Sequence, residues 1–87
     1  MTRAVYSDKR DRFRLSVAST IKAARMAAGV SQRGLAEATG LSHSMIVNIE
    51  DGHSLCSLWA IAQIAEALDT QIDTLVPVLI DEKEAAE

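Results

Sequence analysis

Residues 31–50 of the chain read SQRGLAEATGLSHSMIVNIE, and this stretch decides the fold. Its pattern predicts two short helices, each preceded by a serine that can accept a hydrogen bond from the first helical turn. Ala36 is a small residue where the two helices touch, and Gly40 tolerates the positive φ that the turn between them needs. Ile46 and Ile49 hold the second helix on the core. We therefore expect the second helix to cross the first steeply and to fit a DNA major groove about 12 Å wide.

Apolar residues recurring every three or four positions predict a longer helix before this pair. Ser7 is its expected N-cap, and Gly29 is the expected C-terminal end. The apolar stripe consists of Phe13, Val17, Ile21, Ala24 and Ala28. Gly52 is expected to end the second helix of the pair in the same way.

Two more helices are predicted after the pair. Ser57 is the expected N-cap of the first of them. Its inward-facing residues are expected to be Leu58, Ile61, Ile64, Ala65 and Leu68. Thr70 and Asp73 resemble a capping box, which predicts a last helical turn over residues 71–75.

The segment over residues 76–80 is apolar and is interrupted by Pro77. Proline excludes a central strand or an uninterrupted helix here, and the β-branched neighbours predict a short extended segment. An exposed extended segment of this kind needs a partner. The fold class is therefore an all-α, compact five-helix bundle with a short extended C-terminal segment. Residues 1–80 form one domain, with a possible dimerisation segment at 75–80, and residues 81–87 form an acidic tail.

The length and composition limit the class of protein. A chain of 87 residues suffices for one core, and 48% apolar residues exclude a disordered chain. No apolar run approaches the roughly 20 residues needed to cross a bilayer, and no apolar stretch follows the basic N-terminus as in a signal peptide. Cys56, the single cysteine, excludes an internal disulfide and fits a reducing compartment. We expect a cytoplasmic protein with no membrane partner.

The net charge of −3 conceals a strong asymmetry. Residues 1–33 contain eight Lys or Arg and two acids, whereas residues 34–87 contain one Lys and ten acids. Such a basic first part fits an anionic partner, although a basic run that only solvates a helix gives the same count. Charge alone leaves both interpretations open.

Catalytic and metal sites are not indicated. His43, His53 and Cys56 match no zinc-ligand spacing, and surface histidines are the simpler interpretation. No glycine-rich phosphate loop or nucleophile elbow is present. We expect a protein that is not an enzyme and needs no metal or other cofactor.

The predicted caps, turns and apolar positions occur together at the expected spacing. Residues 21–75 thereby resemble the Cro and phage-repressor type (XRE-like) of the helix-turn-helix family. The shared motifs are Arg25, Gly29-Val30-Ser31-Gln32, Leu35-Ala36, Gly40-Leu41-Ser42, Ile46, Ile49-Glu50-Asp51-Gly52 and Ile64-Ala65-Glu66-Ala67-Leu68. The resemblance implies five helices, a homodimer that binds double-stranded operator DNA, and base reading by the helix that begins at His43.

The resemblance also implies roles for residues outside the base-reading helix. Gln32, at the start of its helix, is expected to bind a DNA phosphate beside free backbone N–H groups. Arg25 and Glu50 match the family's ion pair between the first helix and the end of the base-reading helix. A second role of Arg25 as a phosphate ligand is compatible with this pair.

The base-reading candidates are His43, Ser44, Val47 and Asn48. Asn48 is expected to make a paired contact with adenine, Ser44 and His43 to contact a base or a phosphate, and Val47 to touch a thymine methyl group. This helix departs from the expectation for DNA binding because it carries no Lys or Arg. Phosphate-driven affinity is therefore expected from Arg33, Lys22 and Arg12, with Arg10 and Arg14 beside the last.

Trp59 lies out of phase with the apolar stripe of its helix. It either folds over the edge of the core or forms a dimer contact, because Trp is enriched at interfaces. The candidates for a two-fold dimer interface are Leu55, Trp59, Val76, Val78, Leu79 and Ile80.

Two functions from different classes follow. The first is a sequence-specific transcriptional regulator, a homodimeric repressor that recognises an inverted repeat. The alternative is a protein-binding antitoxin or antiactivator on the same fold. The uncharged base-reading helix, the acidic second part of the chain and the apolar C-terminal segment favour this alternative.

Overall fold

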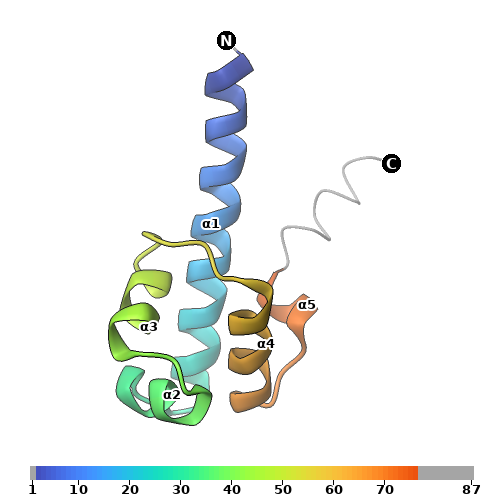
Figure 1. Cartoon of the computed structure of the whole chain (residues 1–87). Helices are drawn as coiled ribbons and strands as arrows, with labels where there is room; N and C mark the ends of the chain where they lie inside the picture. Colours follow the sequence, from blue (N-terminus) through green and yellow to red (C-terminus); the bar gives the residue numbers. More distant parts are fainter. Residues whose placement is uncertain (1, 77–87) are drawn as a thin grey trace.

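The computed structural model describes residues 2–76, with side chains from residue 9 onward. In this range the chain forms α1 (Thr2–Ala27), α2 (Gln32–Thr39), α3 (His43–Glu50), α4 (Leu58–Ala67) and α5 (Ile72–Leu75), and it contains no strand. The helix α1 runs through the middle, with α2 and α3 on one side and α4 and α5 on the other (Figure 1). The predicted all-α fold with five helices is confirmed.

The long helix α1 sets the shape of the molecule. Its 26 residues correspond to about 39 Å, close to the longest dimension of the structure, 41 Å. Its N-terminal part extends past the other helices (Figure 1). Ser7 was predicted as its N-cap, and this is wrong: the helix begins at Thr2, because no proline or glycine interrupts residues 2–6. No described helix is both long and apolar enough to span a membrane.

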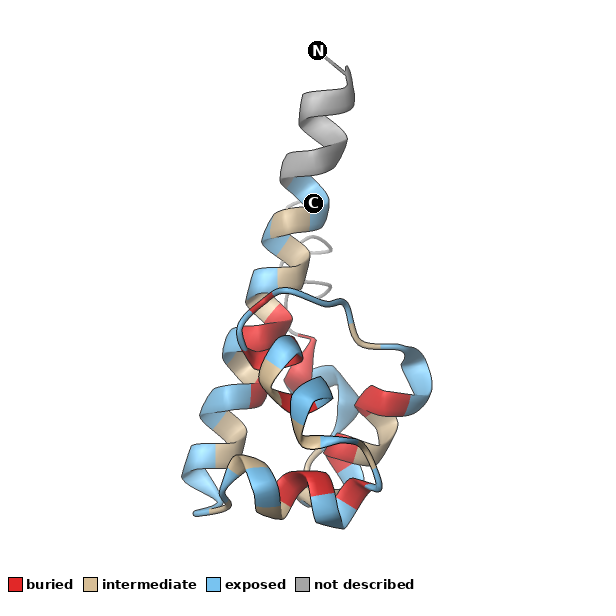
Figure 2. Ribbon diagram, turned by 60° about the vertical axis from the view of Figure 1, so that its left-hand side comes forward, coloured by how far each residue is buried: buried red, intermediate tan, exposed pale blue. Residues whose placement is uncertain are grey.

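The core is shared evenly among the helices. Five large side chains are fully buried, and each comes from a different helix: Ile21, Leu35, Ile46, Ile64 and Leu75. The buried residues lie where the helices face one another (Figure 2). Burying one such side chain contributes roughly 1.5–3 kcal/mol. Ile46 therefore attaches α3 to the centre of the molecule, as predicted.

The three serines predicted as N-caps accept the expected hydrogen bonds. The hydroxyl oxygen of each accepts from the backbone N–H three residues further on, at 2.9 Å for Ser31, 3.0 Å for Ser42 and 3.1 Å for Ser57. An N-cap of this kind contributes about 1 kcal/mol to helix stability.

Three helices end in the same left-handed turn, at Gly29, Gly52 and Asp69, whose φ angles are +72°, +77° and +54°. In each turn this residue donates to the carbonyl three residues back, and the next residue donates to the carbonyl five residues back. The third turn explains why the capping box predicted at Thr70 is wrong. The Thr70 N–H ends α4, and α5 instead begins after Gln71, which makes no side-chain capping bond.

One residue of the predicted inward face of α4 points outward. Leu58 is 77% exposed, whereas Ile61, Ile64 and Ala65 are buried and Leu68 is partly buried as predicted. The prediction for Leu58 is wrong because the inward face of α4 begins only at Ala60, so its first turn lies beyond the core.

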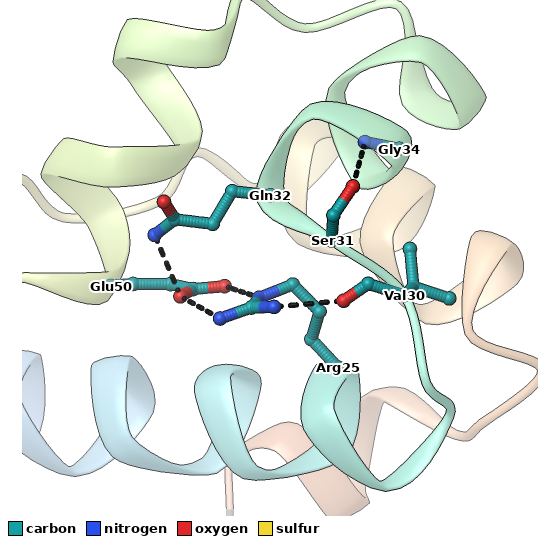
Figure 3. A network of polar contacts seen from close by, with 6 residues as sticks. All are labelled: Arg25, Val30, Ser31, Gln32, Gly34 and Glu50. Atoms are coloured by element: carbon teal, nitrogen blue, oxygen red, sulfur yellow. Dashed lines mark hydrogen bonds and ion pairs between the residues drawn. The ribbon is translucent and has the colours of Figure 1, made fainter.

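A buried network of charged and amide groups joins the C-terminal ends of α1 and α3 (Figure 3). Arg25 donates to both carboxylate oxygens of Glu50, from Nε to Oε2 at 2.7 Å and from Nη2 to Oε1 at 3.0 Å. Its third nitrogen donates to the Val30 carbonyl at 2.8 Å, and the Gln32 Nε2 donates to the Glu50 Oε1 at 3.1 Å. The Glu50 side chain is 1% exposed. The ion pair expected from the family resemblance is thus present, and the start of α2 is joined to it.

A second contact fixes the end of α3 to α1. Arg14 donates from Nε to the carbonyl of Gly52, just after α3, and also pairs with Asp11. A Cβ atom built on Gly52 would lie 2.6 Å from Cδ2 of Leu15. The backbone of this turn therefore lies directly against α1, and glycine is needed there both for its φ angle and for its size.

Replacing Gly52 with alanine is expected to cost more stability than the same change at Gly29. Both positions have positive φ, so each alanine costs about 1–2 kcal/mol. At Gly29 nothing lies near the added methyl group, whereas at Gly52 it forces Leu15 off its rotamer, for about 1 kcal/mol more. Chemical denaturation of G29A and G52A measures the difference. Equal losses would show that the Gly52 contact with α1 is unimportant.

Breaking the ion pair is expected to destabilise the fold strongly. Arg25→Met leaves the buried Glu50 carboxylate without its cation, which costs roughly 3–5 kcal/mol. The double variant R25M/E50M removes both charges and is expected to recover at least half of that loss, because an apolar pair replaces them. Urea unfolding measures both. If R25M is as stable as the unmodified chain, the pair does not hold α3 in place.

Candidate nucleic-acid interface

The outer side of α3 carries the candidate base-reading residues. Ser44 and Asn48 are exposed, and His43 and Val47 are half-buried beside them. Met45, an apolar side chain on the same helix, is 43% exposed. The helix thus presents short polar groups outward while its opposite side packs in the core. Contact of these residues with bases stays a prediction.

The turn between α2 and α3 is fixed by a side chain that sequence reasoning missed. Gly40 has a φ of +79°, as predicted, and its N–H donates to the Ala36 carbonyl. The buried Thr39 hydroxyl donates to the Leu35 carbonyl at 2.8 Å and accepts from the Leu41 N–H at 3.2 Å. A threonine in the last helical turn directly before a glycine is the signal for this role, because its hydroxyl can bond to the carbonyl four residues back.

Gln32 lies at the N-terminal end of α2, where free N–H groups favour an anion. Ser31 satisfies the Gly34 N–H, which leaves the N–H groups of Gln32 and Arg33 without intrahelical acceptors. The Gln32 side chain is half-buried and bonded to Glu50. Its carboxamide still has a second N–H and an oxygen for a ligand. The position of this phosphate candidate is therefore coupled to the ion pair.

The candidate cations are exposed but do not form one cluster. Arg33 lies on α2, and Lys22 and Arg12 lie on α1, ten residues or about 15 Å apart along the helix. Arg14, next to Arg12, is already paired with Asp11 and bonded to Gly52. A ligand that contacts all three candidates must therefore extend over a large part of the surface, as a DNA backbone does.

A hollow of about 390 Å³ lies between α3 and the beginning of α4. Ile49 and Ala60 are among its apolar lining residues. Its hydroxyl and amide groups come from Ser42, Ser44, Asn48, Ser54 and Ser57. The hollow brings two of the base-reading candidates together with the predicted N-cap Ser57 and with Ser54, which sequence reasoning missed.

Two of the candidate dimer residues are exposed in the single chain. Trp59 is 60% exposed and Leu55 is 50% exposed, so Trp59 does not fold over the core. Val76 is 7% exposed and thus belongs to the core of its own chain. The other candidates, Val78, Leu79 and Ile80, lie outside the described residues, as does the predicted extended segment after Val76.

Cys56 does not have the properties of a reactive thiol. Burial raises the pKa of Cys56 to about 11, so the thiol is protonated at neutral pH. A protonated thiol is a poor nucleophile and a poor metal ligand.

Comparisons with known proteins agree with this geometry. A search of curated proteins found no match. The crystal structure of the restriction-modification controller protein C.AhdI from Aeromonas hydrophila is similar, with 33% identity and a TM-score of 0.68. The similarity covers 70% of this chain and 92% of that one. An HTH_3 family transcriptional regulator from Vibrio cholerae has 28% identity and a TM-score of 0.71 over 75% of this chain and 36% of its own.

The helix-turn-helix domain family matches residues 16–79, which is well over half of the chain and includes both helices of the turn. The two solved structures named above have the same fold, with identities above a quarter of the aligned residues. The chain therefore belongs to the helix-turn-helix domain family, in the XRE-like type of DNA-binding transcriptional regulator.

Proposed function

We propose that the protein is a homodimeric repressor that recognises an inverted repeat in double-stranded DNA. The observation that carries the proposal is the two-sided construction of α3. Its outer side exposes Ser44 and Asn48, and its inner side is held to the core by Ile46 and the buried Glu50. Base recognition requires polar groups held rigidly on a helix that enters the major groove.

Phosphate contacts are assigned to residues around α3. Gln32 and Arg33 are placed at the start of α2, where a phosphate gains from the helix dipole and free N–H groups. Lys22 and Arg12 of α1 add positive charge. Because α3 itself carries no Lys or Arg, these outer residues and dimerisation supply most of the affinity.

Dimerisation is proposed through the end of the molecule that carries Leu55 and Trp59, with Val78, Leu79 and Ile80 completing a two-fold patch. Large apolar side chains that are at least half exposed favour such a patch. Trp is among the residues that most often anchor interfaces. A two-fold dimer presents two copies of α3, which accounts for an inverted repeat.

The neighbouring proteins support a role in transcription control. C.AhdI is a restriction-modification controller protein, and the Vibrio cholerae protein is a transcriptional regulator. A protein that acts on DNA operates where the DNA is, which fits the reducing cytoplasm inferred from the single cysteine.

The alternative function is a protein-binding antitoxin or antiactivator. The feature that favours it is the lack of Lys and Arg on α3, which is followed directly by the exposed Asp51. The exposed Met45 on the same helix also suits a protein partner, because methionine is enriched at protein interfaces.

Selection of bound sequences from random duplex DNA tests the proposal directly. The expected result is an inverted repeat whose half-sites lie about 34 Å, or one helical turn, apart. A single half-site would contradict the dimer but not DNA binding. No enrichment at any salt concentration would overturn the proposal in favour of the protein-binding alternative.

Asn48→Ala and Gln32→Ala are expected to affect binding in different ways. N48A loses a paired base contact, so discrimination at one base pair falls by about 1–3 kcal/mol, roughly 5- to 150-fold. Q32A loses a phosphate contact and weakens binding to all sequences by a similar factor. Fluorescence anisotropy with the selected site and single-base variants measures both.

Thermal unfolding is the control for Q32A, because Gln32 also bonds Glu50. If N48A lowers affinity equally for every sequence, Asn48 does not read a base.

A further inference from the structure

An apolar groove of about 280 Å³ opens between α1, α4 and α5, away from the outer side of α3. Its base contains the buried Val17, Ile61 and Val76, and its rim contains Leu55, Leu58 and Ile72. The rim residues are 50%, 77% and 41% exposed, respectively. The volume of this groove is about nine times the roughly 30 Å³ that one water molecule occupies in the liquid, so the groove has room for apolar side chains.

We propose that the occupant of this groove is the chain's own segment Val78–Ile80, which folds back over it within the same subunit. Val76 lines the groove, and the proposed occupant begins only two residues later. Each residue spans at most about 3.5 Å, so Val78 can lie up to roughly 7 Å from Val76 and Ile80 up to roughly 14 Å. Because Val76 itself lines the groove, all three residues are close enough to reach its rim. Successive side chains of an extended segment point to opposite faces, so Val78 and Ile80 share one apolar face that matches the apolar lining.

The position and direction of α5 favour this path. The Thr20 hydroxyl donates to the Leu75 carbonyl at 2.6 Å, which holds the end of α5 against α1. The helices α1 and α5 are in contact, and in Figure 1 α5 lies below the part of α1 that extends past the other helices. Phe13 of α1, which packs against the core, also lines the groove.

Charge complementarity favours the same occupant. Beyond Ile80 the chain reads DEKEAAE, with four acids and one lysine. The exposed Lys9 and Arg10 lie about one turn beyond Phe13 along α1. From Phe13 to Thr2 is about 16 Å of helix, and seven extended residues span about 23 Å, so the tail is long enough to follow the basic part of α1.

The arrangement has a consequence for DNA binding, and this part rests on the proposed function. An acidic tail along α1 competes with DNA phosphates for the positive charge near Arg12. It lowers non-specific binding at low salt and loses this effect at high salt, where exposed charges are screened. With Val78 and Ile80 in the groove, Leu79 lies on the opposite face of the segment and is the residue of the three that remains for the dimer patch.

Cysteine cross-linking in the full chain tests the docking without DNA. Cys56 lines the groove, so V78C and I80C place a thiol near it if the proposal holds, whereas L79C lies on the opposite face of the segment. Mild oxidation at pH 9 is expected to form a disulfide with Cys56 within one chain, at least about tenfold faster for the inward-facing positions than for the control A85C. Rates no faster than A85C overturn the proposal. A disulfide between two chains also overturns it, because it assigns the groove to a second copy.

Two further variants separate the apolar anchor from the acidic tail. V78S/L79S/I80S is expected to lower Tm by about 5 °C or more, since it uncovers the groove. Replacing the four tail acids by D81N/E82Q/E84Q/E87Q is expected to leave Tm within about 2 °C and to raise non-specific DNA affinity about three- to tenfold at 50 mM salt. Unchanged Tm in the first variant contradicts the docking. Unchanged DNA affinity in the second variant contradicts competition between the acidic tail and DNA phosphates. If the unmodified chain binds no DNA, the proposed function is refuted, but the cross-linking result still tests the docking.

Discussion

The ion pair between Arg25 and Glu50 is the constraint on which the candidate DNA-binding surface depends. Glu50 ends α3 and is almost wholly buried, so it is tolerated only because Arg25 meets it with two hydrogen bonds. The same carboxylate receives the Gln32 amide, and the same guanidinium binds the Val30 carbonyl. One charged contact thus sets the angle of α3 and the start of α2 together, and both are fixed to the end of α1.

This arrangement explains how a helix without positive charge can serve as a reading element. The affinity of most DNA-binding proteins comes from phosphate contacts, and sequence is read by uncharged or bidentate groups in the groove. Under the proposed function the two tasks are divided between elements. The short polar side chains of α3 face outward, while exposed cations lie on α1 and α2. Such a division makes the orientation of α3 critical, because uncharged side chains contribute binding energy only when they are aligned with the base edges.

Much of the fold could be predicted from local chemistry. Serine caps, the glycine turns and the apolar spacing each follow from interactions within about five residues, and the boundaries of α3 agree with the prediction at both ends. The errors arose where tertiary context decides. Ser7 could have been a cap, but α1 continues through it, and Leu58 has the right spacing for the core but lies past its edge. The role of Thr39 and the joining of Gln32 to Glu50 depend on contacts between segments, which spacing alone does not reveal.

The even distribution of the largest buried side chains has a consequence for how the domain comes apart. Each of the five helices inserts one large residue into a single centre, from Ile21 in α1 to Leu75 in α5. No helix can leave without uncovering the buried side chains of its neighbours, so detachment of one helix destabilises the others. The domain should therefore populate two macroscopic states, with no stable intermediate in which α2 and α3 swing free. For a surface that must present Ser44 and Asn48 at a fixed angle, cooperativity of the whole core is the source of local rigidity.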